Sequence, residues 1–146
     1  NLTVLCDQER LRGWGLGPAM LADLAAIPRT IRVAPGNVDR LWTERRHWFF
    51  KPAGRYGSKA VYRGDRITKH VWAEIAAGHY GEYIAQELVA PSERMVEIDG
   101  SREPRKIDVR LYVYDGELLL TAARLYRGQA TNFRSPGSGF APVFRI

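Results

Sequence analysis

The segment that most constrains the fold is KIDVRLYVYDGELLLTAARLY, which runs from residue 106 to residue 126. Apolar residues alternate with others on both sides of Asp115-Gly116, and an Asp-Gly pair between two such runs is a strong signal for a two-residue hairpin turn. The segment therefore predicts two long antiparallel strands. Strict pairing across this turn puts Asp108 and Arg124 close together but on opposite faces. One bulged residue would bring them to the same face, and we assume that bulge.

The remaining sequence predicts short strands and a few helices. Apolar residues at helical spacing indicate helices over 17–28, 36–47 and the segment after residue 67, with Asn37 and Thr68 as N-caps. Strands are expected over 47–51, 60–64 and 82–91, with 60–64 as the hairpin partner of 47–51, and 27–33 is expected to be extended. Polar loops are expected over 92–105 and after residue 126. This order of elements predicts an α+β fold with mainly antiparallel sheets and few helices.

The two ends of the sequence suggest part of a longer protein. Residue 1 leads straight into LTVLCD, for which we expect a strand entered midway, and the sequence stops on the apolar run FAPVFRI. No run of 18 apolar residues occurs, so no membrane-spanning helix is expected. Cys6 is the one cysteine, which excludes an internal disulfide and favours a cytoplasmic location.

The net charge of +6 and the pI near 9.8 favour a polyanionic partner. A nucleic-acid-binding domain is one hypothesis, and it requires aromatic and basic side chains on an exposed strand face. Tyr112 and Tyr114 share a predicted strand face with Arg110, whereas Leu111 and Val113 take the other face. Since this is the pattern of an ordinary amphipathic strand, nucleic acid is the less favoured partner.

The segment FFKPAGRYGSKAV, residues 49–61, joins an apolar strand to a basic, glycine-containing loop. Glycines let backbone N–H groups approach an anion without a Cβ in the way. Lysine and serine side chains beside them would add charge and a hydroxyl donor. The candidate anion-binding residues are Lys51, Gly54, Gly57, Ser58 and Lys59. The alternative is an ordinary hairpin loop whose glycines only make the turn.

A second segment, YIAQELVAPSER, reads as a strand with a charged exit. The backbone groups of Gln86, Glu87 and Val89 could bind the two hydrogen-bonding positions on an adenine edge, and Glu93 could accept hydrogen bonds from ribose hydroxyls. The alternative is an ordinary half-buried strand.

A third group of residues belongs to the long hairpin and the loop that follows it. Asp108 and Arg110 are two residues apart and share a strand face, and Arg124 comes from the return strand. Carboxylate and amide oxygens suit Mg²⁺, and guanidinium groups suit phosphate oxygens. Asp108 and Asn132 are therefore candidate metal ligands. The alternative is a surface network of ion pairs.

Taken in order, and together with SPGSGFAPV, these segments resemble the catalytic part of the ATP-grasp superfamily. The resemblance is to its circularly permuted branch, related to glutathionylspermidine synthetase, and it covers residues 28–144. It implies two small α+β lobes that hold ATP and Mg²⁺. It also implies an ATP-dependent ligase that joins a carboxylate to an amine through an acyl-phosphate. Residues 1–35 would end a preceding domain, 36–95 would form the first lobe and 96–146 the second.

The resemblance also implies roles for individual residues. Lys51 would contact the ATP phosphates, and residues 54–59 would form the flap that closes over them. Residues 86–89 would be the adenine hinge, with Glu93 at the ribose. Arg124 would face the transferred phosphate, Asn132 would hold magnesium, and Asp108 and Arg110 match the Asp-x-Arg of the permuted branch.

One departure from the family pattern bears on catalysis. ATP-grasp enzymes carry Glu-x-Asn near the end, but here the position of the glutamate is Ala130, preceded by the neutral Gln129. Asp108 is then the best remaining second acidic ligand. The missing carboxylate supports an alternative function, that of a catalytically degenerate module that binds nucleotide or only scaffolds a partner.

Overall fold

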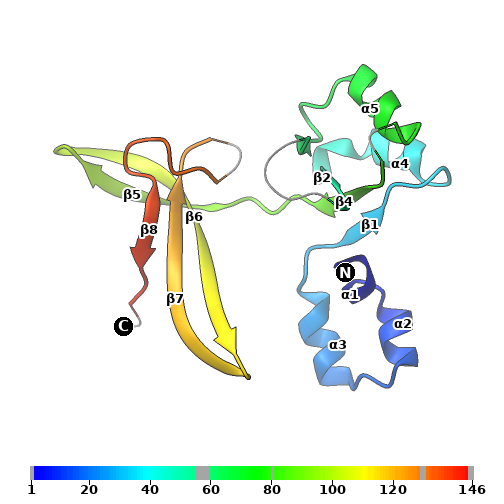
Figure 1. The fold of residues 1–146 in the computed structure, drawn as a ribbon, viewed down its shortest axis with the longest axis horizontal. Coiled ribbons are helices and arrows are strands. Elements are labelled where there is room, and N and C mark those ends of the chain that lie inside the picture. The colour runs from blue at the N-terminus through cyan, green and yellow to red at the C-terminus, as the bar shows by residue number, and fades with distance from the viewer. Residues whose placement is uncertain (1, 55–59, 80, 129–130, 145–146) are drawn as a thin grey trace. The chain divides into compact units, whose positions relative to one another are not determined.

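The computed structural model describes residues 2–54, 60–79, 81–128 and 131–144. The chain divides into two compact units, Asn1–Val89 and Ala90–Ile146. Each unit contains one antiparallel sheet, and all the described helices belong to the first unit, so the chain is of the α+β class as predicted (Figure 1). The boundary between the two units falls between residues 89 and 90 of the sequence. From the sequence, boundaries were expected after residues 35 and 95.

Three short helices begin the first unit: α1 (Leu2–Leu5), α2 (Gln8–Gly13) and α3 (Pro18–Ala25). The strand expected over LTVLCD is therefore wrong, because the backbone closes helical bonds there, from Cys6 N–H to Leu2 O and from Asp7 N–H to Val4 O. The carboxylate of Asp7 then caps α2 by accepting from the N–H of Arg10. The third helix matches the prediction over 17–28 and has Pro18 at its first position.

The sheet of the first unit contains β1 (Thr30–Arg32), β2 (Trp48–Pro52), β3 (Tyr62–Arg63) and β4 (Tyr83–Glu87). Its order is β1-β4-β2-β3 and all pairs are antiparallel. The hairpin partner predicted for β2 is thus confirmed as β3. Because paired residues share a face, the register places the side chains of Phe49, Lys51 and Gln86 on one face of this sheet.

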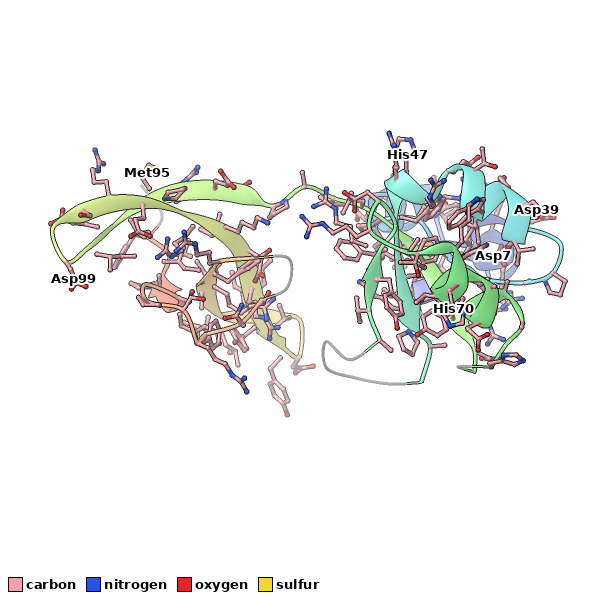
Figure 2. All side chains as sticks on the ribbon, turned by 90° about the horizontal axis from the view of Figure 1, so that it is seen from above. Asp7, Asp39, His47, His70, Met95 and Asp99 are labelled. Carbon is pink, nitrogen blue, oxygen red and sulfur yellow. The ribbon has the colours of Figure 1, made fainter. Side chains whose placement is uncertain are left out.

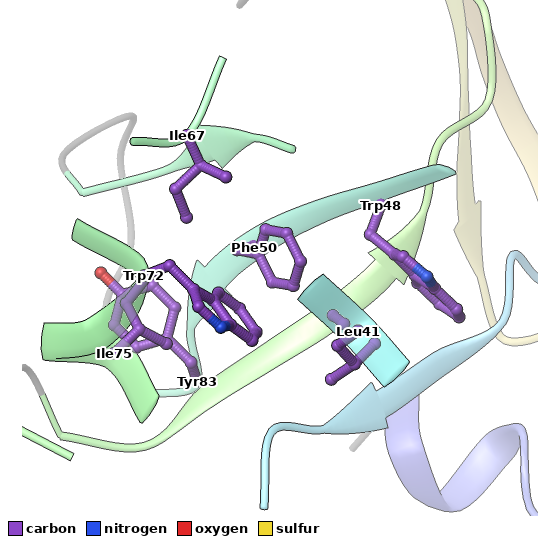
Figure 3. Close-up of a cluster of buried hydrophobic side chains, with 8 residues drawn as sticks. Leu41, Trp48, Phe50, Ile67, Trp72, Ile75 and Tyr83 are labelled. Carbon is purple, nitrogen blue, oxygen red and sulfur yellow. The ribbon is translucent and has the colours of Figure 1, made fainter. Parts of the chain in front are cut away.

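The other face of this sheet packs on α4 (Val38–Thr43) and α5 (Lys69–Ala76) and forms the core shown in Figure 3. The ring centroids of Phe50 and Trp72 lie 4.9 Å apart. The buried members of the core are Leu41, Trp48, Phe50, Ile67, Trp72, Ile75, Tyr83 and Ala85. Burying this many large side chains supplies most of the stability of the unit.

The two predicted N-caps behave differently. Thr68 caps α5 by accepting a hydrogen bond from the N–H of Val71, as predicted. Asn37 stands before α4 but does not cap it, because its carboxamide accepts from the N–H of Ala34 and donates to the carbonyl of Arg32. The predicted helix over 36–47 is also divided, with α4 followed by a separate 3₁₀ turn over Arg45–His47.

The second unit is a meander of β5 (Ser92–Ile98), β6 (Ser101–Tyr114), β7 (Glu117–Tyr126) and β8 (Gly139–Pro142) in the order β5-β6-β7-β8. Residues 92–105 therefore form a hairpin rather than the predicted loop, and β8 lies in the tail that was also predicted as a loop. The hairpin at Asp115-Gly116 is confirmed, with φ of 48° and 80° at its two central residues.

The β-bulge that the sequence argument required is present. Tyr112 pairs with Leu120 and Val113 with Leu118, so the register shifts by one residue at that point. Beyond the shift Asp108 pairs directly with Arg124. The assumption that placed these two side chains on one face is confirmed.

The outer part of this hairpin leaves apolar side chains in solvent on both faces. Leu111 is 63% and Val113 is 59% exposed on one face, and Tyr112 is 40% exposed on the other. The inference that the Leu111 face is the buried side of an ordinary amphipathic strand is therefore wrong. In the described part of the second unit the buried residues are Arg105, Ala123 and Tyr126.

Across the residues that the structure describes, none of the helices has the length and apolarity needed to cross a bilayer.

Candidate functional site

Lys51 lies on the sheet face of the first unit that is opposite the aromatic core. Its ammonium group donates to Oε1 of Gln86 on the neighbouring strand and lies 5.7 Å from the ring centroid of Phe49. Burial lowers the pKa of Lys51 from its usual 10.5. Among the described residues, no carboxylate forms an ion pair with this lysine. Lys51 is therefore a half-buried cation whose charge is met only by a neutral amide.

A chain of hydrogen bonds fixes the amide that holds Lys51. Nε2 of Gln86 donates to Oγ1 of Thr30 at 3.1 Å, and this hydroxyl donates to the carbonyl of Pro28 at 3.0 Å. Thr30 is 1% exposed. The bonds run from β2 through β4 to β1, so the position of the Lys51 ammonium is set by three strands. Sequence inspection missed Thr30, because nothing local to it indicates that it pairs with Gln86.

An open pocket of about 480 Å³ lies on the same face of this sheet, and Lys51 itself is not among its lining residues. Its lining includes Gly54, the first glycine of the predicted phosphate loop, and Ile84, the cross-strand partner of Lys51. The other lining residues are Leu2, Thr3, Arg32, Ala53 and Glu82. Gly57, Ser58 and Lys59 lie outside the described residues, so their predicted roles stay predictions.

In the predicted adenine hinge, 86–89, the backbone N–H groups of two residues already donate hydrogen bonds to other backbone carbonyls. The N–H of Glu87 donates to the carbonyl of Arg29, and the N–H of Leu88 donates to the carbonyl of His47. The strand that carries Gln86 is central in its sheet and not at an edge. Of the residues predicted to contact adenine, Glu87 and Val89 are exposed, and Val89 is 63% exposed.

Glu93 does not lie in the predicted place. It lies on β5, paired with Lys106, and belongs to the second compact unit rather than to the unit that contains Lys51. Its side chain is exposed. The predicted ribose contact is untested, but its assignment to a loop of the first lobe is wrong.

The second unit brings Asp108 and Arg124 into a bidentate ion pair. Nε of Arg124 lies 2.6 Å from Oδ1 of Asp108, and Nη2 lies 2.7 Å from Oδ2. The hydrogen bonds that Arg124 donates to this carboxylate raise the pKa of Arg124 above its ordinary value. The hydroxyl of Thr131 donates to Oδ2 of Asp108 at 3.3 Å, a contact that the sequence did not suggest. Both oxygens of Asp108 are thus occupied by donors.

Tyr126 packs beside this ion pair. Burial raises the pKa of its phenol, and the charge of Asp108 adds to the effect. A neutral phenol therefore borders the Asp108–Arg124 pair over the whole physiological pH range.

Arg110 and Asn132 differ in how they are engaged. Arg110 shares the face of Asp108 and its side chain is exposed, and no carboxylate in the described part of the chain pairs with it. The amide of Asn132 donates to the carbonyl of Arg127, and its oxygen accepts from the N–H of Arg134. Asn132 thus stabilises its own loop, and its oxygen is already hydrogen-bonded.

The described residues contain no cluster of three or more His, Cys, Asp or Glu side chains that could hold a metal ion. His47 lies on the 3₁₀ turn and His70 on α5, on different elements of the first unit (Figure 2). His79 pairs with Glu74 at 2.9 Å. Among the described residues predicted for the site, the cation of the first unit is Lys51, and the second unit contributes Arg110 and the Asp108–Arg124 pair.

Comparisons with protein-family models, with curated proteins and with solved structures returned no match to this chain.

Proposed function

We propose that this chain is the ATP-binding part of an ATP-dependent carboxylate–amine ligase of the ATP-grasp type, which acts through an acyl-phosphate. The observation that carries the proposal is the state of Lys51. A half-buried ammonium group whose hydrogen-bond partner among the described residues is a neutral amide, on the strand that leads into the glycine loop, is suited to bind a phosphate oxygen.

The second unit supports the proposal through its arginines. Asp108 holds the guanidinium of Arg124 in a fixed orientation, and Arg110 presents a second guanidinium on the same strand face. Two positioned guanidinium groups stabilise charge on a transferred phosphoryl group without any nucleophilic side chain. A cytoplasmic location, where ATP is plentiful, fits the single cysteine.

Magnesium fits this site only in part. Asp108 and Asn132 are the residues that would hold it, and both are oxygen donors of the kind that Mg²⁺ prefers. Asp108 would have to share its oxygens with Arg124, and Asn132 would have to give up its loop bond. When bound with ATP, the ion would neutralise phosphate charge while Arg110 and Arg124 of the same unit orient phosphate oxygens.

A second candidate function is a nucleotide-binding module without catalysis. It is favoured by the engagement of both Asp108 oxygens and by the lack of a clustered acidic site among the described residues. Phosphate release from ATP in the presence of pooled acids and amines separates the two candidates. Turnover rejects the second candidate, whereas its absence at saturating nucleotide rejects the ligase.

Thermal unfolding with Mg-ATP tests nucleotide binding. At a concentration about a hundred times Kd, the nucleotide stabilises the protein by about 2.7 kcal/mol. We expect Lys51→Ala and Arg110→Ala to lose most of this gain. The matched controls Lys69→Ala and Arg102→Ala remove exposed cations elsewhere in the same units and should keep it. A wild-type protein that gains nothing from Mg-ATP, or a Lys51→Ala variant that gains as much, would contradict the proposal.

A further inference from the structure

The amine of Lys51 has surroundings that differ from those of the other described lysines. It is half-buried over Phe49, with one hydrogen-bond acceptor, Oε1 of Gln86. Lys69 is exposed at the start of α5, and Lys106 donates to the carbonyl of Gly128. Lys51 is therefore the described lysine whose ammonium form is least solvated.

The charged groups on the same sheet face leave the Lys51 charge uncompensated. Arg32 on β1 pairs with Glu82 at 3.1 Å, and Arg63 on β3 pairs with Asp65 at 3.1 Å. The carboxylates of Glu82 and Asp65 thus each have an arginine partner. Burial disfavours the ammonium form of Lys51, which is why its pKa is lowered.

A lysine in such a place is a nucleophile as well as a cation. Burial increases the fraction of neutral amine near neutral pH, and the neutral amine is the form that attacks carbonyl carbon. One N–H can stay bonded to Oε1 of Gln86, so that the nitrogen lone pair is directed away from the amide. Because Lys51 is only half-buried, a small reagent can reach its amine from solvent.

We propose that the ε-amino group of Lys51 is a covalent modification site that is acylated by small acyl phosphates. The nitrogen lone pair attacks the acyl carbon, the bond from that carbon to the phosphate oxygen breaks, and inorganic phosphate leaves with the electron pair. The nitrogen loses one proton to solvent, and the product is a neutral amide. No oxidant or reductant takes part.

Acylation would remove the positive charge of Lys51. If the proposed function holds, the modified chain would bind nucleotide poorly, so the reaction would act as an off switch. This consequence rests on the proposed function, but the acylation itself does not. The test is therefore run without nucleotide, so that failure of the acylation and failure of ATP binding are distinguishable.

The experiment treats the whole chain with acetyl phosphate at about pH 7.5 and follows each lysine by peptide mass spectrometry. We expect Lys51 to be acetylated about tenfold faster than Lys69 or Lys106, because burial leaves more of its amine in the neutral, nucleophilic form. Equal rates at the three lysines would overturn the proposal. The wild-type pH profile adds a readout that needs no variant, since the lowered pKa of Lys51 should make its acetylation rate level off below pH 10.5.

The variant Gln86→Glu sharpens the test, because it places a carboxylate where the amide oxygen now meets the ammonium group. A carboxylate there favours the charged form, so acetylation of Lys51 should fall about tenfold while Lys69 is unaffected. Gln8→Glu makes the same chemical change at the start of α2 and should leave Lys51 unaltered. An unchanged Lys51 rate in a folded Gln86→Glu protein, as judged by circular dichroism, would refute the role assigned to this environment.

Discussion

Replacing Thr30 by valine tests whether the hydrogen-bonded chain behind Lys51 stabilises the sheet. Valine has nearly the shape of threonine but no hydroxyl. The substitution would leave Nε2 of Gln86 and the carbonyl of Pro28 without the partners that Thr30 provides. Thr30 is 1% exposed, so water cannot readily replace the lost group.

The expected cost follows from these two bonds. An unsatisfied buried polar group costs about 1–3 kcal/mol, and both groups here are only partly buried, so we expect a total loss of about 2 kcal/mol. For a unit of this size that corresponds to a fall in Tm of roughly 8–16 °C. Thr43→Val is the matched control. Its hydroxyl is exposed and bonds only to the carbonyl of Asp39, so the loss should be below about 0.5 kcal/mol.

Urea unfolding followed by tryptophan fluorescence measures this loss in the correct unit. The 4 tryptophans of the chain all belong to Asn1–Val89, and Trp48 and Trp72 are buried in its core. The signal therefore reports on the first unit alone. A Thr30→Val protein as stable as wild type, to within about 0.5 kcal/mol, would refute the reasoning that these bonds hold the Lys51 environment in place.

Four further substitutions, two in each unit, test the packing of the chain. Gly64→Ala should destabilise the first unit by about 3 kcal/mol, because the new Cβ would lie 1.7 Å from the backbone oxygen of Arg45. Gly36→Ala, which meets open space, should be close to neutral in the same urea titration, and equal effects would contradict this account. In the second unit, Leu111→Ser should change stability by less than about 0.5 kcal/mol, since the side chain is exposed. Ala123→Asp places a charge at a buried position and should unfold the second sheet, which circular dichroism would detect as a loss of strand signal. A large loss of stability in Leu111→Ser would show that the face of Leu111 is covered.

The two hairpins of the second unit show what the sequence can and cannot predict. Asp115-Gly116 was recognisable because apolar residues alternate on both sides of it. Asp99-Gly100 makes a similar turn, with positive φ at both residues, but β5 before it has the polar sequence SERMVEI. Alternation of apolar and polar residues arises when one face of a strand is buried. A strand that is exposed on both faces therefore shows no such alternation in its sequence. The turn signal alone would have identified this hairpin.

The candidate site was predictable to the extent that it depends on local spacing. Asp108 and Arg110 share a face because they are two residues apart. The pairing of Asp108 with Arg124 also required a bulge, and nothing in the composition fixes its place at residues 112 and 113. The bond from Lys51 to Gln86 depends on the strand order β1-β4-β2, which brings together residues far apart in the chain. The spacing of residues within a short segment cannot predict a pairing between residues so far apart in the chain.

A crystal structure of the chain with Mg²⁺ and a non-hydrolysable ATP analogue tests the central claim most directly. The account predicts that Nζ of Lys51 leaves Oε1 of Gln86 and lies within hydrogen-bonding distance of a phosphate oxygen of the analogue. If the analogue is absent at saturating concentration, or is bound elsewhere while Lys51 stays on Gln86, the proposal that this lysine binds the phosphates of ATP is wrong.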